Sequence, residues 1–500
     1  MHRSSLRASV LASLLILPLA ACKKSDAEEV GSDSGTDTTE GGVMLGAAAT
    51  SVAIAKVSIN QGVQVTLHIN GSDVSPLNTD LVAGRRALVR VFVAPLSGWV
   101  PREIQAALTV EGASGTEIYE TTMMVGGVSS DGDLGSTFNF VLPGEAVPGD
   151  VDLSISLHEV DEAMFDGDSS QSRWPMDGST YAADFKAVGP LRITLVPVQY
   201  DADGSGRLPD TSEAQVQVYR DLFEGMYPVP SVEITVTPPF PWGSAVAATG
   251  NGWQQLLAAI TGLRGTLGLS PDEYIYGVFN AADTFMDFCG FGCVAGLSSL
   301  AMNPGDSMAR ASIGIGFTGE EAASTMAHEV GHAHGREHAP CMLGGQPSDP
   351  GYPYAGAALG VWGWDGPSNQ LKDPDGYTDI MGYCQPTWIS DYTYDGLLAR
   401  SIAVNALAMG GELPVQEWST TWVDGDGRLG TITTQSMQVG ELGGERHRVQ
   451  FLDASDAVVS EAEAHFYPTD HLPGGILAWP AAPARSRTVD IEGFGRLAID

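Results

Sequence analysis

An eleven-residue run, 328–338, restricts the local backbone to a helix followed by a turn. It reads His-Glu-Val-Gly-His-Ala-His-Gly-Arg-Glu-His, so His328 and His332 are one helical turn apart and share a face. Gly335 permits the left-handed backbone conformation that ends a helix. The chain can then turn back and bring His338 to the other two histidines. The pattern therefore predicts that three imidazoles meet at one point.

Three imidazole nitrogens around one point are typical of a catalytic zinc site, so we predict that His328, His332 and His338 bind one Zn²⁺. Such a site keeps one coordination position open, whereas a structural zinc site is closed by a fourth protein ligand. Glu329 is adjacent to a predicted ligand and would act as the general base toward a metal-activated water. His334 points to another part of the helix surface and is predicted not to bind the metal.

The histidine motif resembles that of the metzincin clan of zinc metallopeptidases. The resemblance implies a Met-turn beneath the metal, which Asp-Ile-Met-Gly-Tyr at 379–383 matches with Met381, although a simple core methionine is the alternative. Tyr383 matches a tyrosine that in some metzincins binds zinc or stabilises the oxyanion; a structural tyrosine is the alternative. The following residues, 384–392, are similar to those of bacterial secreted metzincins, some of which cleave host or mucin-type glycoproteins. The resemblance covers about 190–408.

The same resemblance implies a substrate-binding edge of the sheet. Metzincins bind substrate as an additional strand, and Gly292–Leu300, followed by a strand at Ala311–Phe317, is the counterpart here. An ordinary loop at 292–300 is the alternative. Thr318 and Glu321 match a capping box, which would begin the helix that carries the histidines.

Two changes of pattern divide the chain. Period-two alternation of apolar residues between 51 and 188 predicts an immunoglobulin-like β-sandwich. After Gly189 and Pro190, strand and helix patterns alternate, which predicts an α/β, metzincin-like catalytic domain at 190–408. In this domain Ser212 and Gln215 match a capping box at the start of its first helix. Short strands return at 411–500, so the predicted fold is multidomain, with a small C-terminal β domain.

The first residues predict export. Basic residues near Met1 precede an apolar run over 8–19, which is too short for a permanent membrane-spanning helix, and 1–21 therefore reads as a signal peptide. Its end, Leu-Ala-Ala before Cys22, resembles the lipobox of bacterial lipoproteins and implies a lipid anchor at Cys22; an ordinary signal peptide is the alternative. A polar stretch at 23–42 follows, and we expect 22–50 to form a flexible tether. We expect the protein in the bacterial cell envelope, anchored at the outer membrane or cell surface and contacting membrane through Cys22 alone.

Four cysteines follow Cys22: Cys289, Cys293, Cys341 and Cys384. In an exported protein this even number predicts two disulfides, and three pairings are open. Cys341 follows His338 and Cys384 follows Met381 closely, which favours a bridge between the third histidine and the Met-turn. Cys289 and Cys293 would then close a small loop; a metal site made of thiols is the alternative. No latency segment with a zinc-blocking cysteine is identified.

The net charge of the chain limits the partners that it can bind. The chain has 61 acidic and 25 basic residues, a formal net charge of -36, which argues against nucleic acid as a partner. Asp201, Asp203 and Asp210 are a weak candidate for Ca²⁺, because their spacing does not fit an EF-hand and a polar turn explains them better.

Together these inferences predict a zinc-dependent endopeptidase that hydrolyses peptide bonds of extracellular proteins or glycoproteins. One alternative is a non-catalytic surface adhesin with a structural zinc, against which the retention of Glu329 argues. The other is a zinc amidase that acts on cell-wall linkages. The sequence predicts neither a cleavage-site preference nor an oligomeric state.

Overall fold

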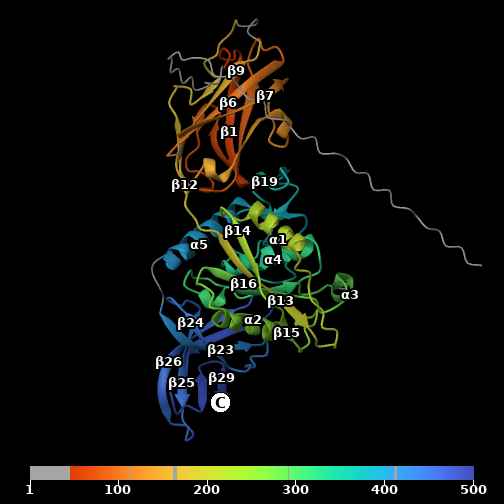
Figure 1. Cartoon of the computed structure of the whole chain (residues 1–500), viewed down its shortest axis with the longest axis vertical. Coiled ribbons are helices and arrows are strands. Elements are labelled where there is room, and N and C mark those ends of the chain that lie inside the picture. Colours follow the sequence, from red (N-terminus) through yellow and green to blue (C-terminus); the bar gives the residue numbers. More distant parts are fainter. Residues whose placement is uncertain (1–44, 114, 162–165, 291, 410–413, 500) are drawn as a thin grey trace, which may run out of the picture. The chain divides into compact units, whose positions relative to one another are not determined.

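The computed structural model describes residues 45–113, 115–161, 166–290, 292–409 and 414–499. The predicted signal peptide and Cys22 lie outside these residues. The described chain is multidomain and β-rich, with 29 strands and five α-helices (Figure 1). None of the helices described here has the length and apolar character needed to cross a membrane.

Two antiparallel sheets share one core in the N-terminal β region, 46–188. Its strands are β1 (Val52–Asn60), β2 (Gly62–Ile69), β3 (Ser72–Asp73), β4 (Leu81–Val82), β5 (Ala87–Pro95), β6 (Arg102–Gly112), β7 (Gly115–Val125), β8 (Phe138–Leu142), β9 (Val151–Glu159), β10 (Arg173–Trp174), β11 (Tyr181–Ala183) and β12 (Phe185–Lys186). One sheet contains β2-β1-β5-β8 in this order, and the other contains β10-β9-β6-β7. Buried side chains of both sheets, such as Val57, Leu108 and Ile155, belong to the same cluster. The alternation of apolar residues thus produces a two-layer packing.

Helices alternate with strands in the central region, 189–409. Its elements are β13 (Leu191–Tyr200), α1 (Glu213–Met226), β14 (Val232–Val236), β15 (Phe240–Trp242), α2 (Trp253–Leu267), β16 (Glu273–Phe279), α3 (Phe285–Cys289), β17 (Gly296–Ser298), β18 (Ala311–Ile315), α4 (Glu320–Ala333), β19 (Gly363–Asp365), β20 (Gln370–Lys372), β21 (Thr378–Asp379), β22 (Thr387–Trp388) and α5 (Asp391–Met409). The main sheet has the order β14-β13-β16-β18-β17. All neighbours in it are parallel except β17, which pairs antiparallel with β18 at the edge.

Helices cover both faces of this sheet (Figure 1). Side chains such as Leu195 and Tyr276 pack with α1 and α4, whereas their neighbours Val196 and Ile275 pack with α2. This is the alternation that a pleated strand imposes when both of its faces are buried. A Cβ on Gly277 in β16 would lie 2.7 Å from Ile260 of α2, so glycine there permits close packing of α2 on the sheet.

The two predicted capping boxes have different outcomes. Ser212 is the N-cap of α1, and its side chain accepts a hydrogen bond from the backbone N–H of Gln215. The reciprocal bond of a capping box is not formed, because the side chain of Gln215 bonds to the backbone of Gly319 instead. The prediction for α4 is wrong, because Gly319, and not Thr318, is the N-cap and provides no side-chain bond. Gly319 has a φ of 126°, a backbone conformation that side-chain-bearing residues rarely adopt.

One antiparallel sheet forms the C-terminal β region, 414–499. Its strands are β23 (Val415–Val423), β24 (Thr433–Gln438), β25 (Glu445–Leu452), β26 (Val458–Pro468), β27 (Gly475–Pro480), β28 (Thr488–Ile491) and β29 (Gly495–Ala498). Their order is β24-β23-β27-β26-β25-β28-β29. The loop that joins β26 to β27 reaches the central region, where Ser299 and Thr469 form an isolated antiparallel bridge.

The boundary near residue 189 is a change of sequence pattern and not a separation in space. The hairpin β19–β20 belongs to the central region by sequence, but β19 pairs with β2 and extends a sheet of the N-terminal region. In addition, Trp388 donates from Nε1 to the carbonyl oxygen of Gly62 at 2.8 Å. The buried guanidinium of Arg85 donates to backbone carbonyls at the end of α1 and just beyond it, among them those of Gly225 and Val229.

Replacing Arg85 by methionine should lower the free energy of unfolding by about 3 kcal/mol, because several buried carbonyls lose their donor. Urea denaturation followed by tryptophan fluorescence measures the change. The neighbouring Arg86 is exposed, so Arg86→Met should change stability by about 1 kcal/mol or less. Equal losses for both variants would contradict this role of Arg85.

Candidate metal centre

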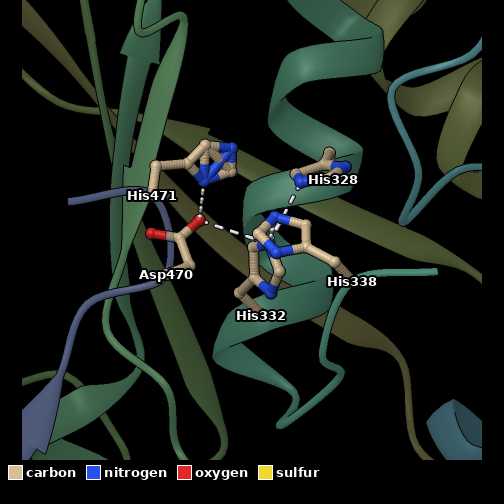
Figure 2. Close-up of side chains that lie close together, drawn as sticks. All are labelled: His328, His332, His338, Asp470 and His471. Atoms are coloured by element: carbon tan, nitrogen blue, oxygen red, sulfur yellow. Dashed lines mark hydrogen bonds and ion pairs between the residues drawn. The ribbon is translucent and has the colours of Figure 1, made fainter. Parts of the chain in front are cut away.

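Three imidazoles meet where the motif predicted (Figure 2). His328 and His332 lie on α4, and their Nε2 atoms are 3.0 Å apart. Gly335 has a φ of 80°, and the chain turns back after it. The Nε2 atom of His338 thereby lies 3.2 Å from that of His332. All three side chains are buried, so water competes little for these nitrogens.

Backbone carbonyls hold two of these rings. His328 donates from Nδ1 to the carbonyl of Ile380, and His332 donates from Nδ1 to the carbonyl of Arg336, both at 2.6 Å. Because a carbonyl can only accept, the ring proton is on Nδ1, and each Nε2 presents a lone pair to the common point.

The donor set fits a bound metal ion. Burial lowers the pKa of His332 to about 4 and that of His338 to about 3, so both rings are neutral near pH 7. Lone pairs that face each other at about 3 Å repel unless a cation lies between them. Neutral imidazole Nε2 atoms are common zinc ligands.

Glu329 projects from α4 beside this point. Its side chain is buried, and within the described structure its Oε2 atom has no hydrogen-bond partner. Burial, and the nearby carboxylate of Asp470, raise the pKa of Glu329 well above its usual range. A Cβ on Gly296 of β17 would lie 2.2 Å from Oε1 of Glu329, so glycine in the edge strand makes room for the carboxylate.

The turn at 379–383 packs beneath α4. A Cβ on Gly331, between the two helical histidines, would lie 2.5 Å from the sulfur of Met381, which places Met381 against that turn of the helix. The buried carboxylate of Asp379 accepts from the backbone N–H of Met381 at 2.8 Å and of Ser390 at 2.9 Å. The turn is thus held on both sides, and it presents the Ile380 carbonyl to His328.

Tyr383 reaches the centre from this turn. Its hydroxyl oxygen lies 3.0 Å from Nε2 of His338 and donates to Oε1 of Gln346 at 3.2 Å. Burial raises the pKa of the phenol above its usual value, so the hydroxyl keeps its proton. Tyr383 can therefore donate a hydrogen bond to a group bound near His338.

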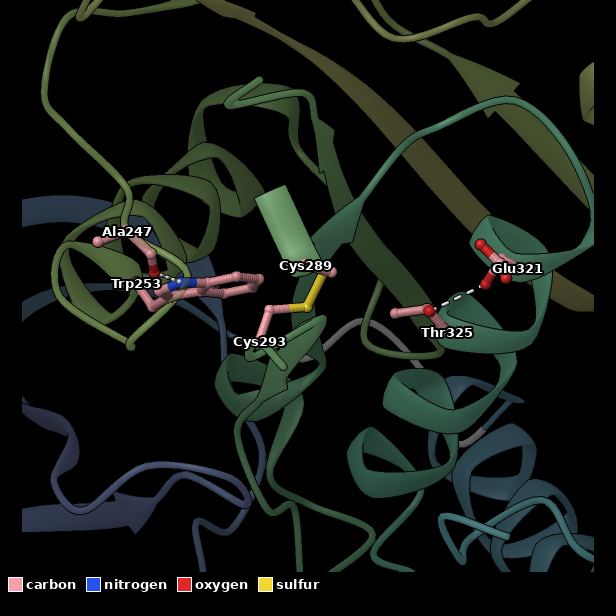
Figure 3. The surroundings of a disulfide bond; sticks show 6 residues. All are labelled: Ala247, Trp253, Cys289, Cys293, Glu321 and Thr325. Carbon is pink, nitrogen blue, oxygen red and sulfur yellow. Dashed lines mark hydrogen bonds between the residues drawn. A yellow bond between two sulfur atoms is a disulfide. The ribbon is translucent and has the colours of Figure 1, made fainter. Parts of the chain in front are cut away.

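The four cysteines form the two disulfides that we expected. Cys341 pairs with Cys384, which links the segment after His338 to the segment after Met381. Cys289 pairs with Cys293 at the end of α3, just before the edge strand β17 (Figure 3). Near this second bridge, Trp253 donates from Nε1 to the carbonyl of Ala247 at 2.9 Å.

Two residues that the sequence analysis did not identify also lie at the centre. Asp470 and His471 come from the loop between β26 and β27 (Figure 2). Oδ2 of Asp470 is 3.2 Å from Nε2 of His332. The ligand atoms of these two residues and of the three histidines all lie within 4.8 Å of one another. The structure thus brings two further side chains to the three predicted ligands, from a region whose sequence shows no metal-site pattern.

The other candidates lie outside this cluster. His334 donates from Nδ1 to the Val330 carbonyl at 2.8 Å and stacks on Tyr274, with ring centroids 4.2 Å apart. The carboxylate of Asp203 accepts from Ser205 and pairs with Arg207 at 2.7 Å, which lowers the pKa of Asp203 to about 2. These bonds are those of a polar turn.

Comparison with known proteins supports a metallopeptidase. The model of the family described as Peptidase M66 matches residues 301–384, which include the three histidines, Glu329 and Met381. No curated protein matches. Among solved structures, a calcium-binding mutant of Bacteroides uniformis beta-glucuronidase 2 is 9% identical and covers 47% of this chain and 25% of that chain, with a TM-score of 0.15. The chain thus spans a quarter of that protein's length, and a likeness this weak supports no conclusion about fold or function.

Replacing His332 by alanine should abolish tight zinc binding, because it removes the central ligand atom of the cluster. Zinc content after dialysis against a weak chelator, measured by mass spectrometry, should fall from about one ion per chain to near zero. The matched control is His447→Ala in β25, which should keep its zinc. Full zinc retention in His332→Ala would contradict the site.

Proposed function

We propose that this protein is a zinc-dependent endopeptidase of the metzincin type that acts on extracellular proteins or glycoproteins. The observation that best supports the proposal is that three buried Nε2 lone pairs converge beside Glu329, whose carboxylate has one oxygen without a hydrogen-bond partner among the described residues. The match of 301–384 to a peptidase family supports it.

The residues of the chain have separable roles. Zn²⁺, when bound, lowers the pKa of a water molecule and polarises the substrate carbonyl. His328, His332 and His338 would hold the ion. Glu329 takes the proton of the attacking water on its free oxygen and passes it to the leaving amine. Tyr383 donates a hydrogen bond from its hydroxyl to the oxyanion that develops on the carbonyl oxygen.

The edge strand supports a polypeptide as the substrate. β17 ends the main sheet, and its Gly296 lies directly against the carboxylate of Glu329. An extended peptide that hydrogen-bonds to this edge would bring a backbone carbonyl to the general base. The Met381 turn beneath α4 matches the Met-turn that the metzincin resemblance implies, and it supports the metzincin type. Export with a lipid anchor at Cys22 remains part of the proposal and places the substrates outside the cell.

A structural zinc site in a non-catalytic adhesin is the second candidate. The presence of Asp470 and His471 at the centre favours it, because a catalytic site needs an open position. The oxygen of Glu329 that lacks a partner within the described part of the chain favours catalysis, since a closed structural site does not require a buried carboxylate beside its ligands.

Glu329→Gln should keep its zinc and lose at least about 1000-fold in the rate of peptide-bond cleavage, because the amide cannot accept the proton of the water. Casein and a mucin-type glycoprotein serve as substrates, with bound zinc measured in both proteins. The control is Glu417→Gln, an exposed site in β23. Equal cleavage by Glu329→Gln and wild type would refute the mechanism.

Tyr383→Phe should lower kcat about 100-fold and leave KM and zinc content nearly unchanged, because it removes a donor to the transition state only. Steady-state kinetics on a fluorogenic peptide measure both constants. Tyr181→Phe in β11 is the matched control and should behave as wild type. A raised KM with normal kcat would assign Tyr383 to substrate binding instead.

A further inference from the structure

The geometry points to Asp470 as a fourth protein ligand that closes the metal centre, so that the loop between β26 and β27 holds the enzyme in a latent form. This inference rests on the proposed function, because latency has meaning only for a peptidase. The C-terminal β region would thereby supply one of the metal ligands.

The carboxylate of Asp470 lies beside the three histidines, and the ligand atoms of all four residues are within 4.8 Å of one another. Tetrahedral zinc with bonds of about 2.0–2.1 Å separates its ligand atoms by roughly 3.3 Å. The Nε2 atoms of His328 and His338 are 3.0 and 3.2 Å from Nε2 of His332, and Oδ2 of Asp470 is 3.2 Å from the same atom. The carboxylate oxygen is therefore as far from Nε2 of His332 as the other two nitrogens are. Histidine and aspartate are both ordinary zinc ligands.

The backbone before Asp470 occupies the sheet edge next to β17. Leu300 donates its N–H to the Pro468 carbonyl at 3.0 Å, and Ser299 and Thr469 form an antiparallel bridge. Ser298 donates its N–H to Oδ1 of Asp470 at 2.9 Å. A substrate strand on this edge needs the same backbone groups. The loop thus occupies the sheet edge where a substrate peptide would bind. Its Asp470 takes the ligand position that the attacking water would need.

His471 covers the remaining face of the centre. The centroid of its ring lies 5.2, 5.6 and 4.9 Å from those of His328, His332 and His338. Its Nε2 lies 3.5 Å from Oε1 of Glu329, and its carbonyl accepts from the side chain of Gln346 at 3.0 Å. Under this cover His332 is 0% and Glu329 1% exposed. A polypeptide can reach the metal only if the loop moves away.

Non-covalent contacts hold the loop, and to withdraw it would also break the packing of Leu472 on the core beside α2 and the bond from Gln254 to the Pro473 carbonyl. Asp470 and His471 are fixed by hydrogen bonds to Ser298 and Gln346 and by contacts at the centre, none of them covalent. Pro473 and Gly474 follow directly, and Gly474 has a φ of 113°, so the loop ends in a turn outside the strands. Withdrawal of the loop would leave β26 and β27 paired.

The test uses the full chain with Asp470→Asn, which keeps the acceptor for Ser298 but replaces the charged ligand. Asp426→Ala, at an exposed turn of the same β region, is the control. Competition with a chelator measures zinc affinity, and casein cleavage measures activity. We expect Asp470→Asn to bind zinc about 10- to 100-fold more weakly than wild type and to cleave casein at least about 10-fold faster at saturating zinc.

Unchanged zinc affinity in Asp470→Asn would overturn the assignment as a ligand. Slower cleavage by this variant would overturn the latency and make Asp470 a contributor to the reaction. If no variant cleaves casein or glycoprotein, the proposed endopeptidase function fails, and the zinc affinities still decide whether Asp470 is a ligand. The double variant Glu329→Gln with Asp470→Asn should bind zinc as weakly as Asp470→Asn and cleave nothing.

Discussion

Two hydrogen bonds, from Nδ1 of His328 and of His332 to backbone carbonyls, determine what the centre of this protein can hold. They fix the protons on the outer nitrogens and turn the lone pairs inward, where a cation must balance them. The carbonyl for His328 comes from the Met381 turn and that for His332 from the bend after α4. The packing of both segments is therefore part of the metal chemistry, and the disulfide Cys341–Cys384 joins them covalently.

The features that depend on local spacing were predictable from the sequence. A helical turn places His328 beside His332, and a glycine that can adopt positive φ brings His338 back, so the trio follows from eleven residues. The proximity of two cysteines to the ends of the site favoured the bridge that the structure contains. Alternation of apolar residues likewise predicted the strands of the N-terminal β region, because a two-layer packing buries every second side chain.

The features that depend on contacts between distant segments were not predictable. Asp470 and His471 are an ordinary Asp-His pair in a loop of a β sheet, and only tertiary folding brings them to α4. The start of α4 was predicted at Thr318 from a capping pattern, but Gly319 is the N-cap and has no side chain that could bond to the first turn of the helix. The domain boundary at 189 was visible as a change of periodicity, whereas the return of β19–β20 to the first sheet was not.

The hairpin β19–β20 makes the folding of the N-terminal and central regions interdependent. In a shortened polypeptide that began after residue 189, β19 would lack its partner β2, and Trp388 would lose the carbonyl of Gly62. The unpaired strand would offer its free backbone groups to neighbouring molecules, which is how exposed sheet edges seed self-association. A soluble catalytic fragment therefore has to keep the first sheet or replace it with a designed cover.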